Sequence, residues 1–390
     1  MDESMLQNEF PIYLDYASTT MVDPLVVEIM IEHIKLMEFH GNASSAHHMF
    51  GRVARTAIEE ARSNVAELIN AESEEIIWTS GATESINLAL KGAAHYYKRI
   101  GNHIITVETE HKAVLEVCKK LSTEGFNVTY LTVDRDGRID EQMLKSAIRP
   151  ETILISVMHV NNETGVIQDI ERIAEIARSH NVLFHVDAAQ SLGKIPINVK
   201  ESKIDLISLC AHKIYGPKGI GALFVKSNPA ILLETEMHGG GQENGLRSGT
   251  LATHQIVGMG RAFKLAKEQL DYDRQHAVSI KKIILNELSK IEGLSINTPQ
   301  LNSIPNILNL SIDSIKNIIL LSRLKNVAIS SGSACSSSSI QSGSHVLKAM
   351  GLSDERINNS IRISWGRFTT IDDIKLGCDA LKVAIKSIRN

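Results

Sequence analysis

The sequence has few cysteines, and they lie far apart. The four are Cys118, Cys210, Cys335 and Cys378 among 390 residues, and no two form a Cys-x-x-Cys pair. This spacing gives no sign of a disulfide framework or of a zinc site. Widely spaced cysteines without a framework are typical of a reducing compartment, so we expect a cytoplasmic protein.

Long apolar runs and a strong charge of one sign are also missing. No apolar run approaches the roughly 18 residues that a membrane span needs. Residues 1–4 are acidic and lack the basic and apolar segments of a signal peptide, so we expect none. The net charge of −4 argues against nucleic acid or an anionic membrane as the main partner.

The middle of the chain alternates between short β-branched runs and helical patterns. This alternation predicts an α/β fold with a mostly parallel sheet that helices cover on both sides. We expect strands at 75–79, 103–107, 128–133, 152–157, 182–187 and 205–209, and helices at 83–97, 113–121 and 170–179.

The length of the chain predicts more than one small core. Residues 257–291 carry the pattern of one long amphipathic helix, which we interpret as a bridge into a second, smaller domain. We therefore expect a large domain at 20–260 and a small domain formed by 1–19 and 261–390.

Lys213 follows the apolar run 205–209 and precedes a turn with two glycines and a proline. Burial at a strand end lowers the pKa of a lysine and frees its amine for Schiff-base chemistry. Pyridoxal phosphate (PLP) enzymes need such a lysine and a carboxylate for the ring nitrogen. Asp187 ends the apolar run 182–187 upstream. A lone lysine would more simply be a solvated strand terminus, but its pairing with Asp187 favours the PLP interpretation.

The segment 330–344 is unusual in composition, because nine of its fifteen residues are serine and Cys335 lies near its centre. Composition alone favours a flexible surface linker. The segment lies, however, between a predicted strand at 327–329 and a predicted helix at 346–350. A lone thiol on a tether inside a folded domain is a candidate mobile nucleophile, so we predict a mobile catalytic loop at about 330–344.

Five sequence motifs occur together in this chain. They are Thr-Ser-Gly-Ala-Thr-Glu-Ser at 79–85, His-Val-Asn-Asn-Glu-Thr-Gly at 159–165, Cys-Ala-His-Lys-Ile-Tyr-Gly-Pro-Lys-Gly at 210–219, Arg-Ser-Gly-Thr-Leu at 247–251 and Ser-Ser-Gly-Ser-Ala-Cys at 330–335. In order and spacing they resemble the PLP-dependent cysteine desulfurases of the IscS/NifS group.

The resemblance implies a fold-type I architecture like that of class-V aminotransferases. The large domain would hold a mostly parallel seven-stranded sheet and the smaller domain would be α+β. The resemblance also implies a homodimer with PLP as cofactor. Such an enzyme converts L-cysteine to L-alanine through an external aldimine of PLP.

The cofactor site can be read partly from the residues themselves. Residues 79–83 join a strand to a helix, so free backbone N–H groups and the helix dipole can hold a phosphate, although an ordinary N-cap would look the same. The resemblance implies that Asp187 pairs with the ring nitrogen, Gln190 with the phenolic oxygen, and that Thr250 reaches the phosphate of the neighbouring subunit. The full implied cofactor set is Ala82, Thr83, His111, Asn162, Asp187, Gln190, Cys210, His212, Lys213 and Thr250.

The resemblance also implies the catalytic roles. Lys213 and His111 would move protons as general base and acid, and Cys335 would take the sulfur as a persulfide. Arg362 would clamp the substrate carboxylate, with Arg367 as the alternative and a surface role for the other. Asn162 and Asn42 would contact the substrate. No stable metal site is implied, and Cys335 would at most be a transient iron–sulfur ligand shared with a scaffold protein.

The long Ser/Gly-rich tether places the chain with the long-loop, IscS-like members, which pass sulfur to acceptors such as an iron–sulfur scaffold or a tRNA-thiolation protein.

Two departures from the family pattern stand out. Cys210 replaces the serine that usually donates to the phosphate, and a thiol is a poorer donor. The sequence ends at Asn390 without the tail that many IscS proteins use to hold their scaffold. The alternatives are a selenocysteine lyase or other fold-type I PLP enzyme, and a non-catalytic scaffold of the same fold.

Overall fold

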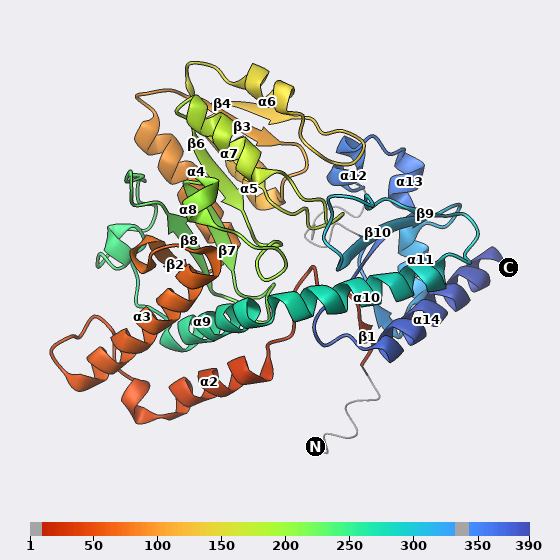
Figure 1. Ribbon diagram of the computed structural model, residues 1–390, viewed down its shortest axis with the longest axis horizontal. Coiled ribbons are helices and arrows are strands. Elements are labelled where there is room, and N and C mark those ends of the chain that lie inside the picture. Colours follow the sequence, from red (N-terminus) through yellow and green to blue (C-terminus); the bar gives the residue numbers. More distant parts are fainter. Residues whose placement is uncertain (1–9, 332–342) are drawn as a thin grey trace.

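The computed structural model describes residues 10–331 and 343–390. Within this part of the chain the centre is a seven-stranded sheet with the strand order β2-β8-β7-β6-β5-β3-β4 (Figure 1). Strand β8 runs antiparallel to both neighbours and the other strand pairs are parallel. The mostly parallel seven-stranded sheet is therefore confirmed. Its strands are β2 (Ile76–Thr79), β3 (His103–Val107), β4 (Asn127–Leu131), β5 (Thr152–Met158), β6 (Leu183–Asp187), β7 (Leu206–Cys210) and β8 (Gly221–Val225).

Helices cover both faces of this sheet, which explains why its central strands are apolar on both sides. On one face Ile58 and Phe263 join the core cluster of Ile155. On the other face Ile86 packs in the cluster of Leu154. The first layer contains α3 (Met49–Ile69), α7 (Ile170–Ser179) and α9 (Thr253–Glu268), and the second contains α4 (Ala82–Tyr97) and α5 (Lys112–Thr123).

A second core lies beside the main sheet, around a three-stranded sheet of order β12-β10-β9. Its strands and main helices are β9 (Leu294–Ile296), β10 (Ile307–Ile312), β12 (Ser360–Ser364), α10 (Leu270–Leu288) and α14 (Ile371–Arg389). A short sheet pairs β1 (Ile12–Tyr13) in parallel with β11 (Val327–Ala328), which brings the N-terminal segment to this second core. The domain limits given above remain a prediction.

The single helix predicted at 257–291 is wrong, because the structure has two helices that meet at Gln269. This residue has φ −109° and ψ 7°, outside helical geometry. The two helices bury their apolar faces in different cores. Phe263 of α9 packs on the main sheet, whereas Ile280 and Ile284 of α10 pack in the second core. The break lets one continuous apolar pattern serve two cores.

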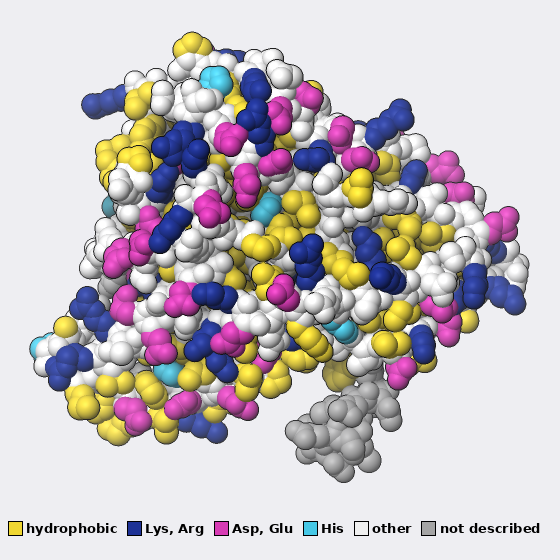
Figure 2. Space-filling view, viewed as in Figure 1, with side chains coloured by type: hydrophobic (Ala, Val, Ile, Leu, Met, Phe, Trp, Pro, Cys, Tyr) yellow, Lys and Arg dark blue, Asp and Glu magenta, His cyan; other side chains and the backbone are white. Residues whose placement is uncertain are grey.

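The remaining helices are short or peripheral. They are α2 (Pro24–Lys35), α6 (Glu141–Ala147), α8 (Val199–Ser202), α11 (Asn317–Arg323), α12 (His345–Ala349) and α13 (Asp354–Asn358). Helix α2 buries Val26 against α9 but leaves Leu25, Ile31 and Ile34 exposed, and apolar side chains gather over it at the lower edge of Figure 2. None of the helices in the described ranges has the length and apolarity that a membrane crossing requires.

Candidate active site

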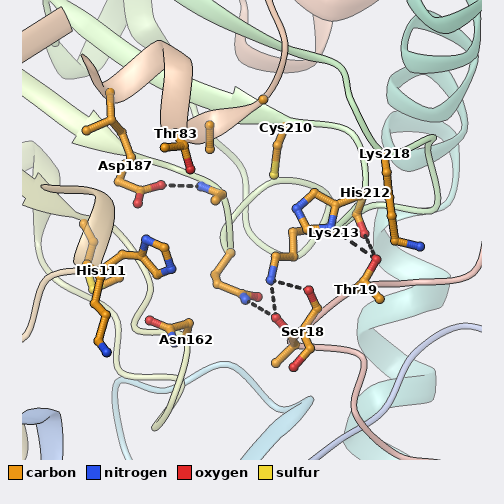
Figure 3. A pocket seen from close by; sticks show the side chains of 18 of the residues that line it. Ser18, Thr19, Thr83, His111, Asn162, Asp187, Cys210, His212, Lys213 and Lys218 are labelled. Atoms are coloured by element: carbon orange, nitrogen blue, oxygen red, sulfur yellow. Dashed lines mark hydrogen bonds between the residues drawn. The ribbon is translucent and has the colours of Figure 1, made fainter. Parts of the chain in front are cut away.

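A cavity of about 580 Å³ opens at the carboxyl ends of the parallel strands, where ligands bind in open α/β sheets. The first turn of α4, the loops after β5, β6 and β7, and residues 17–19 form its walls. Ten of the predicted site residues line it: Ala82, Thr83, His111, Asn162, Asp187, Gln190, Cys210, His212, Lys213 and Arg362. Figure 3 shows His111, Asn162, Asp187 and Lys213 around the same space.

Lys213 enters the cavity from the loop that follows β7. Its Nζ donates hydrogen bonds to the backbone oxygens of Ala17 and Ser18, the latter at 2.8 Å. Both acceptors belong to the N-terminal segment that leads from β1 to the cavity wall. The amine is therefore held at a fixed point by carbonyl groups.

Asp187 is the last residue of β6, and its carboxyl group is buried. Its Oδ1 accepts a hydrogen bond from the backbone N–H of Ala189 at 2.9 Å. Burial raises the pKa of Asp187, while His111, the Ala189 N–H and Lys213 act in the opposite direction. A cationic partner placed beside this carboxyl group would stabilise its charged form.

The N-terminus of α4 provides an anion cradle at one end of the cavity. Gly81 is the N-cap residue, and Ala82 and Thr83 begin the helix, so their N–H groups precede the first intrahelical bonds. A Cβ at Gly221 would lie 2.6 Å from Cα of Gly81 and 2.5 Å from the oxygen of Leu209. Only glycine at the start of β8 thus allows the cradle loop to rest against the sheet.

Cys210 ends β7 beneath this cradle and is fully buried. Burial raises the pKa of its thiol to about 11, with Lys213 acting in the opposite direction. The group is therefore a neutral thiol at neutral pH. It can offer only a weak S–H donor to an anion in the cavity.

His111 is the N-cap residue of α5. Its Nδ1 accepts a hydrogen bond from the backbone N–H of Ala113 at 3.1 Å. A backbone N–H can only donate, so the neutral ring must carry its proton on Nε2. The tautomer of His111 is thus fixed by the start of the helix, and Nε2–H is the group it can present to a reactant.

Gln190 and His212 complete the wall next to Lys213. The Nε2 group of Gln190 donates to the oxygen of Ala17 at 2.7 Å, so Ala17 accepts from both Gln190 and Lys213. The Nδ1 atom of His212 lies 3.2 Å from Oγ1 of Thr19. Burial and then the charge of Lys213 lower the pKa of His212 to about 4, so its ring is neutral at pH 7.

Arg362 lies on β12 and is 2% exposed. One terminal nitrogen donates to the oxygen of Asn162 at 2.8 Å, and the other to Asp15 Oδ1 at 2.8 Å and Ser18 Oγ at 2.7 Å. Its buried Nε has no hydrogen-bond partner within the described ranges. Arg362 thus joins the second core to the cavity and retains a donor for a further acceptor.

Arg367, the predicted alternative, does not line the cavity. It forms ion pairs with Asp23 at 2.9 Å and Asp273 at 2.7 Å, and its guanidinium lies 4.5 Å from the ring centroid of Tyr215. The expected surface role for one of the two arginines is therefore wrong, because both side chains are buried in hydrogen-bonded clusters.

Three predicted residues are not among those that line the cavity. Asn42 is exposed, and its Oδ1 accepts from the N–H of Ser44 at 2.9 Å. Thr250 is exposed on the loop before α9. Cys335 and most of the predicted loop at 330–344 lie outside the described residues. Within the described part of a single chain, Asn42 and Thr250 do not line the cavity.

The sequence analysis missed the part of the site formed by backbone groups and by distant segments. The oxygens of Ala17 and Ser18 accept from Lys213, and Asp15 pairs with Arg362. A carbonyl oxygen occurs in every residue and leaves no signature in the sequence. Lys194, which contacts Gln190, was also missed, although it follows Gln190 closely in the sequence.

The chemistry of these groups fits PLP. The α4 N-terminus suits a phosphate, the buried Asp187 suits a protonated ring nitrogen, and Lys213 offers an amine for the aldehyde. The cavity volume lies within the usual range for cofactor sites. No cluster of three or more metal-ligating side chains occurs within the described ranges.

Comparisons with known proteins agree with this geometry. The family model "Aminotransferase class-V" matches residues 12–376. A protein named cysteine desulfurase IscS from Vibrio vulnificus (strain CMCP6) is 51% identical over 98% of this chain and 94% of its own length. A solved structure titled NifS-like protein has a TM-score of 0.90 at 35% identity, covering 97% of this chain and 100% of that one. A structure titled SspA in complex with cysteine has a TM-score of 0.81 at 39% identity, covering 92% of this chain and 99% of that one.

Proposed function

We propose how individual residues act in catalysis, starting from the fact that this chain belongs to the class-V aminotransferase family and, within it, to the IscS/NifS cysteine desulfurases. It is a PLP-dependent enzyme that removes sulfur from L-cysteine and leaves L-alanine. The observation that carries the proposed roles is the convergence of Lys213, Asp187, His111 and Arg362 on one cavity.

Bound PLP supplies an electron sink that stabilises negative charge on the α-carbon of the substrate. We assign its phosphate to the N-terminus of α4 with Thr83, and its ring nitrogen to the buried carboxylate of Asp187. Gln190 would donate to the phenolic oxygen, and the amine of Lys213 would hold the aldehyde carbon. Cys210 would add only a weak donor near the phosphate.

The proton transfers belong to Lys213 and His111. The amine of Lys213 takes the proton from the α-carbon of cysteine and later returns a proton to the carbon skeleton. In its neutral form the ring of His111 carries its proton on Nε2, because Nδ1 accepts from the Ala113 N–H. In this form His111 offers Nε2–H as a hydrogen-bond donor to the reacting groups, and it relays a proton only where another group returns one to the ring.

Arg362 is the proposed clamp for the substrate carboxylate, because a guanidinium matches a carboxylate geometrically. Its Nε has no hydrogen-bond partner among the residues that the structure describes, and a terminal nitrogen donates to the backbone oxygen of Asn162. A carboxylate bound here would share the guanidinium with Asp15 and Ser18. This arrangement supports substrate binding between the main sheet and β12.

Cys335 is the proposed sulfur acceptor on the strength of its sequence motif alone. Its thiolate attacks the sulfur of the substrate, a new S–S bond forms, and the Cβ–S bond of cysteine breaks. The electron pair of the broken bond stays with the carbon skeleton, which is protonated and leaves as alanine. The sulfur remains on Cys335 as a persulfide.

Dimeric assembly follows from membership of the family. We infer that the exposed Thr250 reaches the phosphate site of the partner subunit, which would explain why it lies outside the cavity of its own chain. We further propose that the persulfide is passed, in the cytoplasm, to a protein acceptor such as an iron–sulfur scaffold or a tRNA-thiolation protein.

The test is to measure alanine and sulfide release from L-cysteine by the wild type, Cys335→Ala and, as a matched control, Cys378→Ala. We expect all three to bind PLP. Alanine formation should fall about a hundredfold or more in Cys335→Ala only. Equal rates in wild type and Cys335→Ala would contradict the persulfide role. Alanine formation from selenocysteine that survives in Cys335→Ala alongside an inactive cysteine reaction would favour a selenocysteine lyase.

A further inference from the structure

A second lysine, Lys194, lies behind the cavity wall and has no part in the roles proposed above. Its Nζ donates to the side-chain Oε1 and to the backbone oxygen of Gln190, both at 2.9 Å. Together with Lys213 it borders a small cavity of about 30 Å³ on the far side of the wall. The amine thus contacts Gln190 from the side that faces away from the main cavity.

The amide of Gln190 is held between two groups of opposite hydrogen-bonding character. On one side it receives a hydrogen bond from Lys194, whose ammonium form can only donate. On the other side its Nε2 donates at 2.7 Å to the oxygen of Ala17, which can only accept. A rotated amide would place two donors against each other and two acceptors against each other. These contacts therefore select one amide orientation.

The same contacts join the two lysines through one hydrogen-bonded chain. Lys194 donates to Gln190, Gln190 donates to Ala17, and Lys213 donates to the same oxygen of Ala17. A change at Lys194 can therefore reach the groups around Lys213 through Gln190.

Burial of the Lys194 amine at this position costs free energy of folding. Lys194 forms no ion pair with any carboxylate in the described ranges. Burial and then the charge of Lys213 lower its pKa to about 7, while Cys210 acts in the opposite direction. The charged side chains that also border the small cavity are Lys213, Asp273, Arg274 and Arg367. A buried amine without a carboxylate destabilises the fold, so its contact with Gln190, and not stability, accounts for its presence.

We propose that Lys194 is a positioning residue of the cofactor site, which fixes the Gln190 amide so that its Nε2 is directed to the side of Ala17 and Lys213. This inference rests on the proposed function, in which Gln190 donates to the phenolic oxygen of PLP. Lys194 acts through Gln190 and contacts neither cofactor nor substrate.

The test is a double-mutant cycle on the full-length protein with Lys194→Met, Gln190→Met and the double variant. The first measurement is the dissociation constant of PLP from the apoprotein. The second is the pH midpoint of the visible absorbance change of the bound cofactor. Loss of one oriented hydrogen bond should raise the dissociation constant about five- to tenfold in Lys194→Met. The double variant should match Gln190→Met, because Lys194 would have nothing left to orient. Lys194→Arg, which keeps a donor, should recover part of the affinity.

Lys281 provides the matched control, since burial also lowers its pKa and it does not line the cavity. Lys281→Met should leave both cofactor measurements unchanged. If Lys194→Met and Gln190→Met have additive effects, or if Lys194→Met lowers only the urea midpoint of the apoprotein, the positioning role is wrong. A wild-type protein that binds no PLP would instead overturn the proposed function itself.

Discussion

Single residues at the cavity illustrate how the protein uses burial to set charge. Asp187 is enclosed at the end of β6, where burial opposes its ionisation and raises its pKa. One backbone N–H and the nearby His111 and Lys213 favour the charged form. The carboxylate is thus poised to gain a cationic partner, such as a protonated ring nitrogen, with little competition from water.

Replacement of Asp187 by Asn should therefore impair catalysis more than folding. An amide has the same shape but cannot keep a ring nitrogen protonated, so we expect kcat to fall about a hundredfold or more while PLP still binds. Steady-state alanine formation and the visible spectrum of the bound cofactor check this. Asp205→Asn is the control, because Asp205 is also largely buried and accepts a backbone N–H at 3.0 Å, but lies outside the cavity. A similar loss in both variants would contradict the assigned role.

The sequence was sufficient to predict those site residues that carry unusual side chains at strand ends. Lys213 and His111 follow apolar strands and Asp187 ends one, and parallel strands bring their carboxyl ends to one edge of the sheet. It was not sufficient for Ala17 or Ser18, because their contribution is a backbone oxygen brought close by the pairing of β1 with β11. Such contacts depend on packing between segments far apart in the chain.

At the scale of elements, a polar line crosses the centre of the main sheet. The Nδ1 of His185 on β6 lies 2.9 Å from Ser156 Oγ on β5, and its Nε2 lies 2.9 Å from Ser208 Oγ on β7. His185 is fully buried, and burial lowers its pKa to about 3. The neutral ring thus ties three adjacent strands just below the residues that line the cavity.

This line predicts a loss of stability in acid. The unfolded chain takes up a proton on His185 near pH 6.5, whereas the folded chain does so only near pH 3. The neutral ring of His185 therefore makes its full contribution to the free energy of unfolding above pH 6.5. This contribution is lost as the pH falls towards 3, by about 1.4 kcal/mol per pH unit. Urea unfolding of the apoprotein between pH 7 and 4.5 should show a falling midpoint, and a shallower fall in His185→Gln.

The fall of the urea midpoint with decreasing pH should be smaller in His185→Gln but should not disappear. The reason is that burial also lowers the pKa of His159 and His212, each to about 4. His40→Gln serves as the control, since His40 is exposed. A pH dependence that is identical in wild type and His185→Gln would count against the polar line as a source of acid sensitivity.

The elements also differ in how well the sequence predicted them. Six of the seven strands of the main sheet were predicted, and central ones such as β5 and β7 were recognised as short apolar runs buried on both faces. Strand β8 was not predicted. Helix α3 was not predicted, although Ile58, Val65 and Ile69 recur at helical spacing. The break at Gln269 could not be found from periodicity, because the apolar pattern continues through it and only the change of core reveals it.

At the scale of the whole molecule, the loop that carries Thr250 is anchored to the main sheet. Glu243 forms a buried ion pair with Arg62 at 2.8 Å and accepts from the N–H of Trp78 at 2.7 Å. Arg247 pairs with Glu84 at 2.8 Å in the first turn of α4. The exposed Thr250 is therefore presented from a well-anchored loop, as a contact with a second subunit requires.

Complementation between subunits tests this arrangement. Thr250→Ala and Lys213→Ala are each expected to be impaired as homodimers. A heterodimer with one change in each subunit contains one site with an intact Lys213 and an intact Thr250 from the partner. Co-expressed and purified with two different tags, it should regain about half of the wild-type activity. A heterodimer as inactive as the two parents would place Thr250 in the site of its own chain.

The central claim is that the amine of Lys213 holds the cofactor aldehyde. The most direct measurement is borohydride reduction of the purified wild-type protein, followed by digestion and mass spectrometry of the peptides. We predict a phosphopyridoxyl group on the peptide that contains Lys213, at close to one per chain. A label on Lys194 or Lys218 in its place, or full activity in a protein that carries no label, would contradict the account.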